Sequence, residues 1–118
     1  MSAKTKHHLR DRKVFAALLR SKRRFFSTFL MAYFMPNRVR TWRAAVSISK
    51  TKYKLAVERN LIRRQVKAIM REQFCNLNAV DVLVIINQGF LELTFKEKQT
   101  IFLNLCQKLQ ELDAPKPK

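Results

Sequence analysis

The sequence predicts an α+β fold with the element order α-β-β-α-β-α and a sheet that carries its helices on one side. Apolar residues recur at helical spacing in three segments, and at strand spacing or in short continuous runs in three others. The chain has 118 residues, 47% of them hydrophobic, with nine phenylalanines, which suffices to bury one core. We therefore expect a single domain over residues 9–112, between flexible tails at 1–8 and 113–118.

The first two expected elements are a helix over residues 9–21 and a strand over residues 27–35. In the helix, an apolar stripe within residues 14–19 opposes basic side chains. The strand is apolar on both faces, which is typical of a strand that is covered on both sides. The dipeptide Pro-Asn at 36–37 marks the turn that follows.

The next strand, expected over residues 42–50, alternates clearly between two faces. Ala44, Val46 and Ile48 point one way, and small or polar residues point the other way. The first face joins the core. The second is either a surface that the backbone of another molecule can approach or an ordinary solvent-facing side.

The segment over residues 56–72 predicts a helix with an unusual charge pattern. Ile62, Val66 and Ile69 form its apolar face. Like charges follow one another at i,i+4 spacing along another side: Arg59, Arg63, Lys67 and Arg71. Such a row weakens a helix by itself. We therefore expect a polyanion to supply the missing negative charge.

The last two elements are a buried strand over residues 81–86 and a helix over residues 94–112. The strand is a short continuous apolar run, and the segment Asn-Gln-Gly that closes it contains the chain's only glycine. The helix has balanced charges, which favours a packing role. If the strands that begin at 42 and 81 pair in parallel, the basic helix between them is their crossover.

The charge distribution indicates nucleic-acid binding. The formal net charge is +17, and residues 1–72 carry all of it, with 20 lysines and arginines against three acidic residues. A basic excess in one part of a chain favours a localised binding face. An anionic membrane surface is the alternative, because a merely solubilising surface normally mixes both signs. No apolar run approaches the ~20 residues of a membrane span, so we expect no membrane insertion.

The cysteines and histidines predict neither a disulfide nor a metal site. Cys75 and Cys106 lack the CxxC spacing of metal and redox motifs, which favours reduced thiols and a cytoplasmic compartment. His7 and His8 are adjacent in a polar tail with no further histidine, whereas a zinc site needs three or four ligands. A solvated tail is thus favoured over a metal site, and we expect the protein itself to bind no cofactor.

Two ordered motifs resemble the signature of the bacterial ribonuclease P protein subunit. SISK-x-K at Ser47–Lys52 matches a serine-rich strand that ends in lysine, and LAVERNLIRRQVK at Leu55–Lys67 matches an Arg-Asn-Arg-x-Lys-Arg helix. LRDRKVFAALLRSKRRF and DVLVII, with the last helix, resemble the family's opening and closing elements. The chain departs from the pattern at Leu61, where arginine is usual, at Arg63, where lysine is usual, and at Leu19, where an aromatic residue is common.

The resemblance implies a two-layer α/β sandwich of a kind also found in a ribosomal protein, with the basic helix in a left-handed crossover. General topology rules favour a right-handed one. It also implies that a catalytic RNA subunit with bound Mg²⁺ removes the 5′ leader from precursor tRNA. The protein would bind the RNA subunit and the leader without catalytic residues of its own.

Two other functions compete with this one. A general RNA-binding or ribosomal protein without a processing role would share the charge and the fold. A protein that cleaves RNA unaided would need positioned acids and bases. The basic region offers only Asp11, Glu58, Glu72 and the two histidines, which disfavours that class.

The residues expected to bind the RNA subunit lie at the end of the 42–50 strand and along the basic helix: Lys50, Lys52, Arg59, Asn60, Arg63, Arg64, Lys67 and Arg71. Arginine suits this role because its planar guanidinium can hold two phosphate oxygens at once. Asn60 is open to two interpretations. It either caps the helix or donates a hydrogen bond to RNA.

Single-stranded RNA is held by aromatic stacking surfaces beside a basic groove. The expected leader cleft is formed by Arg10, Arg12, Lys13, Phe15, Leu19, Tyr33, Phe34, Ser47 and Ser49. Phe15 matches the family's cleft aromatic residue but also suits an ordinary core position. The sequence leaves open whether Tyr33 or Phe34 faces the cleft, and whether the basic turn at 22–24 contacts RNA or is only solvated.

Overall fold

The computed structural model describes residues 9, 12–39, 41–75, 77 and 79–113, which form three helices and four strands. The predicted tail at 1–8 and residues 114–118 of the other predicted tail lie outside this part. The elements follow the order α-β-β-β-α-β-α: α1 (Arg12–Leu19), β1 (Arg24–Phe26), β2 (Leu30–Pro36), β3 (Arg43–Ile48), α2 (Ala56–Gln73), β4 (Val80–Ile86) and α3 (Phe95–Asp113).

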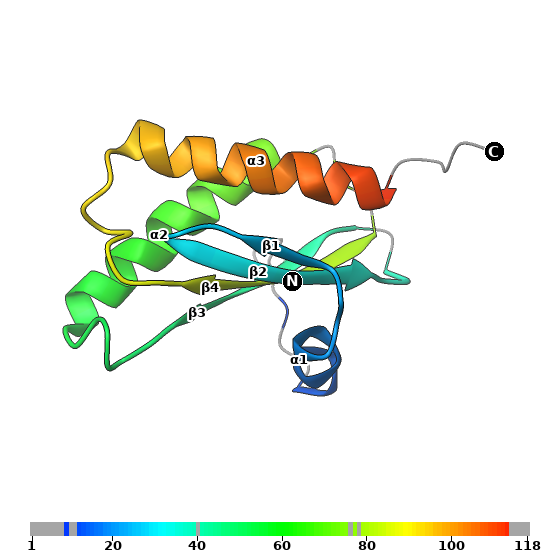
Figure 1. The fold of residues 1–118 in the computed structure, drawn as a ribbon, viewed down its shortest axis with the longest axis horizontal. Helices are drawn as coiled ribbons and strands as arrows, with labels where there is room; N and C mark the ends of the chain where they lie inside the picture. The colour runs from blue at the N-terminus through cyan, green and yellow to red at the C-terminus, as the bar shows by residue number, and fades with distance from the viewer. Residues whose placement is uncertain (1–8, 10–11, 40, 76, 78, 114–118) are drawn as a thin grey trace, which may run out of the picture.

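The four strands form one mixed sheet with the order β1-β2-β4-β3 (Figure 1). β1 pairs antiparallel with β2, and β2 pairs antiparallel with β4. β3 pairs parallel with β4, so α2 connects two adjacent parallel strands. The predicted crossover helix is thereby confirmed, and it is the basic one.

The sequence prediction missed one strand. Residues 24–26, expected partly in a basic turn, form β1, and the strand predicted from residue 27 starts only at Leu30. Between them lies a tight hairpin in which the Ser27 N–H donates to the Leu30 carbonyl at 2.9 Å. A three-residue strand is too short to show a periodic pattern in the sequence. Only its pairing with β2 defines it.

The sheet is covered on both faces. α2 and α3 lie on one face and α1 lies on the other (Figure 1). The larger core, which includes Val66, Val84 and Leu105, fills the space under α2 and α3. A smaller cluster of Leu9, Leu18 and Leu83 lies under α1. The prediction that all helices share one side is correct for α2 and α3 and wrong for α1.

The long helices begin in different ways. At α3, the Thr94 hydroxyl accepts the Glu97 N–H at 3.1 Å, and the Glu97 carboxylate accepts the Thr94 N–H at 2.8 Å. This is a capping box, which satisfies two backbone donors at once. At α2, the N-cap residue is Leu55, whose side chain cannot cap. The start of the basic helix must therefore be held by other contacts.

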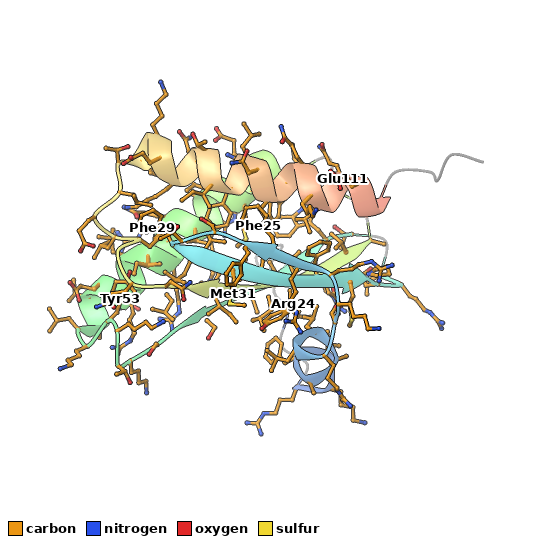
Figure 2. All side chains as sticks on the ribbon, viewed as in Figure 1. Arg24, Phe25, Phe29, Met31, Tyr53 and Glu111 are labelled. Carbon is orange, nitrogen blue, oxygen red and sulfur yellow. The ribbon has the colours of Figure 1, made fainter. Side chains whose placement is uncertain are left out.

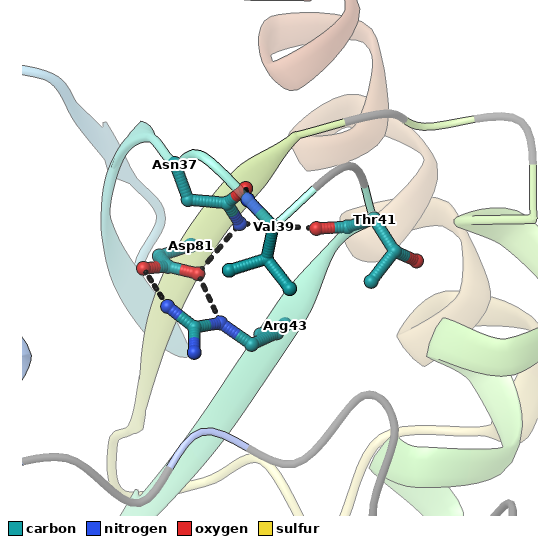
Figure 3. A network of polar contacts seen from close by, with 5 residues as sticks. All are labelled: Asn37, Val39, Thr41, Arg43 and Asp81. Carbon is teal, nitrogen blue, oxygen red and sulfur yellow. Dashed lines mark hydrogen bonds and ion pairs between the residues drawn. The ribbon is translucent and has the colours of Figure 1, made fainter.

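One end of the sheet is fixed by a polar network around the buried Asp81 carboxylate (Figure 3). The Arg43 guanidinium donates to both oxygens of Asp81, at 2.9 and 2.8 Å. The Asn37 amide donates to Asp81 at 2.8 Å and to the Thr41 carbonyl at 3.0 Å. The network joins β3, β4 and the turn after β2.

Among the described residues, none of the helices combines the length and the apolar character that a membrane-spanning helix needs.

Candidate nucleic-acid interface

The basic residues of α2 lie on the sides of the helix that face away from the core. Ile62, Val66, Ile69 and Met70 are buried against the sheet and α3. Because residues three and four apart share a helix face, this burial directs the charged positions between them outward. Of the predicted RNA-binding residues on α2, Asn60, Arg64, Lys67 and Arg71 are exposed, while Arg59 and Arg63 are half-buried.

Most cations on α2 have no partner among the residues that the structure describes. Four of them make no ion pair and no side-chain hydrogen bond with the residues that the structure describes: Arg63, Arg64, Lys67 and Arg71. The i,i+4 repulsion along this row is thus not relieved within the described fold. A bound polyanion would relieve it, because each neutralised phosphate releases condensed counterions.

Arg59 differs from the rest of the row. Its guanidinium donates to the Tyr53 carbonyl at 2.7 Å and to the Lys54 carbonyl at 3.0 Å. These contacts hold the connection from β3 at the start of α2, where no side chain caps the helix. Arg59 is therefore partly engaged in the protein's own structure. Asn60 is the fifth residue of α2 and does not cap it, which excludes the capping interpretation.

The connection between β3 and α2 is anchored by Tyr53. Its buried hydroxyl donates to the Asn87 carbonyl at 2.8 Å and accepts the Phe90 N–H at 3.2 Å. Burial raises the pKa of Tyr53. The Lys52 ammonium donates to the Asn87 side-chain oxygen at 3.3 Å, and Lys50, two residues earlier, is exposed. Both predicted lysines thus lie in the turn that precedes the basic helix.

The strand aromatics are divided between the two faces of the sheet. Tyr33 packs against the small cluster under α1, whereas Phe34 is only 4% exposed and belongs to the large core under α2 and α3. Successive side chains of a strand point to opposite faces, so only one of the two can lie on the α1 side. Tyr33 is that residue, and the inclusion of Phe34 in the predicted cleft is wrong.

The predicted residues of α1 also differ in their surroundings. Phe15 is half-buried and packs against the small cluster, so it is partly a core residue and partly accessible. Leu19 is 51% exposed, at the end of the helix. Arg12 and Lys13 are exposed on its first turn, and Arg10 lies outside the described residues.

The two predicted serines have different roles. Ser47 is exposed on β3, in register with Ile85 of β4. The Ser49 hydroxyl accepts the N–H groups of Thr51 and Lys52, at 3.1 and 3.3 Å. Ser49 thus shapes the turn toward α2, while Ser47 presents an exposed hydroxyl on the α1 side of the sheet.

Sequence reasoning missed the contribution of β1 to this side. The Arg24 guanidinium lies 5.0 Å from the centre of the Tyr33 ring. Figure 2 shows Arg24 and Met31 on the α1 side of the sheet and Phe25 on the α3 side. Phe26 is 78% exposed. The apolar pair after Arg23 and Arg24 was a signal in the sequence, but only strand pairing reveals which of the two phenylalanines faces outward.

The described residues contain no cluster of three or more histidine, cysteine, aspartate or glutamate side chains that could hold a metal ion. His7 and His8 lie outside those residues. Cys75 and Cys106 are free thiols, the first exposed and the second buried. Burial raises the pKa of Cys106.

Comparisons with known proteins agree on one family. The family model for ribonuclease P matches residues 3–110. The ribonuclease P protein component of Mycoplasma genitalium is 57% identical over 114 residues, which cover 97% of this chain and 89% of that protein.

Two solved structures share the fold. A mutant RNase P protein from Staphylococcus aureus superposes with a TM-score of 0.79 at 19% identity, over 88% of each chain. The RNase P protein from Thermotoga maritima gives 0.76 at 21% identity, over 86% of this chain and 96% of that one. Together with the sequence matches, this shows that the chain belongs to the ribonuclease P protein family.

Proposed function

We propose that α2 and the turn before it bind the catalytic RNA subunit of ribonuclease P. The observation that supports this is the row of exposed or half-buried cations on α2 without partners among the described residues. Arg64, Lys67 and Arg71 would contact phosphates directly, and Arg63 flanks them. Lys50 and Lys52 extend the same charge toward β3.

The α1 side of the sheet is the proposed site for the single-stranded 5′ leader of precursor tRNA. It combines an accessible part of Phe15, the Tyr33 ring and the exposed Ser47 with the cations Arg12 and Lys13. Aromatic faces hold bases by stacking, and the nearby cations hold the backbone. The two RNA sites would therefore use different parts of the molecule, α2 for the RNA subunit and the α1 side for the leader.

As a member of this family, the chain is part of the ribonuclease P holoenzyme, which matures tRNA at its 5′ end. The chemistry would be supplied by the RNA subunit with its Mg²⁺, in the cytoplasm. The protein residues would neutralise phosphates, so that the RNA folds with fewer metal ions, and would hold the leader. None of them would transfer a proton or act as a nucleophile.

The test is reconstitution with the RNA subunit at a Mg²⁺ concentration too low for the RNA alone. Addition of the protein should restore cleavage of precursor tRNA at the mature 5′ end. Failure to do so with RNA that is correctly folded, as judged by its activity at high Mg²⁺, would overturn the proposal. Cleavage by the protein without the RNA subunit would overturn the assignment of the chemistry.

A further inference from the structure

Phe26 is the most exposed large apolar side chain in the part of the chain that the structure describes, with 78% of its surface accessible. It is the last residue of β1, an edge strand, and the neighbouring Phe25 packs against the large core. Burial thus accounts for Phe25 and leaves Phe26 without a packing role. The aromatic ring of Phe26 is therefore open to contact with a bound molecule.

Strand register places Phe26 on the α1 side of the sheet. Phe26 is opposite Met31 on β2, and Arg24 is opposite Tyr33. Opposed residues of an antiparallel pair share a face, and Figure 2 places Arg24 and Met31 on the α1 side. Across the sheet, the row continues from Met31 through Ile85 to Ser47. Phe26 therefore extends the proposed leader surface outward by one strand.

The charge around Phe26 favours an anionic partner. Lys22, Arg23 and Arg24 precede it, all three are exposed, and no acidic residue occurs between residues 12 and 57. Arg24 also lies over the ring of the half-buried Tyr33 and two residues before the exposed Phe26, so this cation neighbours both aromatic residues. A flat apolar group beside closely spaced cations matches the chemistry of a nucleobase on a phosphodiester backbone.

We propose that Phe26 stacks on a base of the 5′ leader, as a second platform beside Tyr33, with Arg24 on the phosphate between the two bases. The proposal rests on the proposed function and adds a residue and a second base position to it. Diagonal neighbours on adjacent strands are about 7–8 Å apart, so Phe26 and Tyr33 can each take one base of an unstacked strand. Sheets with aromatic residues on neighbouring strands bind RNA in this manner.

The test compares the affinity of holoenzymes for precursor tRNAs with leaders of increasing length. Phe26→Ala should lower affinity for the long leaders by about 5- to 10-fold, the lower part of the range for stacked bases, and leave short leaders unaffected. Phe26→Trp should retain the wild-type affinity because it keeps a stacking face. Phe95→Ala is the matched control, since Phe95 is 47% exposed at the start of α3, on the other side of the sheet.

A second measurement identifies the base. One leader nucleotide at a time is replaced by an abasic one. At one position, the replacement should lower the affinity of the leader for the wild-type holoenzyme but not for the Phe26→Ala holoenzyme. Such non-additivity reports direct contact. Suppose that the wild-type holoenzyme binds long leaders more tightly than short ones, while the Phe26→Ala holoenzyme has the same affinity as the wild type at every length and every abasic position. In that case the inference about Phe26 fails and the proposed function stands. If the wild type itself ignores the leader, the proposed leader site fails with it.

Discussion

Asp81 and Arg43 form an ion pair at one end of the sheet, with 2.8 Å between an Asp81 oxygen and an Arg43 nitrogen. The Asp81 side chain is 2% exposed and that of Arg43 is 24% exposed. The pair joins the parallel strands that α2 connects, and Asn37 adds a third element to it. It therefore holds the sheet geometry on which the basic helix depends.

Removal of the arginine should destabilise the fold strongly. Arg43→Met leaves the buried Asp81 carboxylate with the Asn37 amide as its one remaining side-chain partner among the described residues, and such a loss costs about 3–5 kcal/mol. The free energy of unfolding from urea titration measures the effect. Arg38→Met, in an exposed turn nearby, is the control and should change stability little. The double variant Arg43→Met/Asp81→Leu should recover much of the loss, and equal loss in the double variant would contradict this account.

Tyr33 and Phe34 should respond differently to truncation. Tyr33→Ala should weaken the affinity of the holoenzyme for precursor tRNA and leave its affinity for mature tRNA unchanged. Phe34→Ala creates a cavity in the large core and should cost about 3–5 kcal/mol of stability. Equal affinity losses for both tRNAs in a folded Tyr33 variant would show that Tyr33 serves only packing.

Phe15 allows a similar comparison. Because it is half-buried, Phe15→Ala should lower both stability and the preference for precursor over mature tRNA. Phe15→Leu should restore much of the packing but not the aromatic stacking face. A leucine variant with a full precursor preference would therefore assign Phe15 to the core alone.

Arg64 provides the test of the α2 surface. Arg64→Ala should weaken binding of the RNA subunit and reduce the slope of log affinity against log salt by about 1, the effect of one lost phosphate contact. Lys108→Ala, which removes an exposed charge from α3, is the control. An unchanged salt slope in the Arg64 variant would show that this residue does not contact a phosphate.

Lys98 predicts a pH dependence of stability. Lys98 lies on α3 and is 3% exposed. Its ammonium donates to the Gln65 side chain of α2 at 2.8 Å. Burial lowers the pKa of Lys98 below 10.5. The unfolded chain therefore binds this proton at a higher pH than the folded protein does. The free energy of unfolding should rise with pH between the folded pKa and about 10.5.

The contribution of Lys98 is isolated by comparing variants. Lys98→Met should remove this part of the pH dependence, whereas Lys96→Met, at an exposed position of the same helix, should keep it. Both proteins are measured by denaturant titration from neutral pH upward. The same pH dependence in Lys98→Met and the wild type would show that Lys98 titrates alike in both states.

The positions of most elements could be predicted from the sequence. α2 was expected at 56–72 and spans Ala56–Gln73, and β4 was expected at 81–86 and spans Val80–Ile86. These segments have strong periodicity or a continuous apolar run, and both patterns arise from burial of one face or two. β1 has three residues and no pattern of its own, so its existence depended on pairing with β2.

The sequence by itself determined that this protein has a basic amphipathic helix, because charge and helical spacing are properties of the chain alone. Only the tertiary structure decided which side chains form the surface on the α1 side of the sheet. It placed α1 opposite the other helices, Tyr33 outside the large core and Phe34 within it, and it placed Phe26 on the same face of the sheet as Tyr33. The physical reason is that the face of a strand residue depends on the register and the covering of the whole sheet, which local spacing cannot specify.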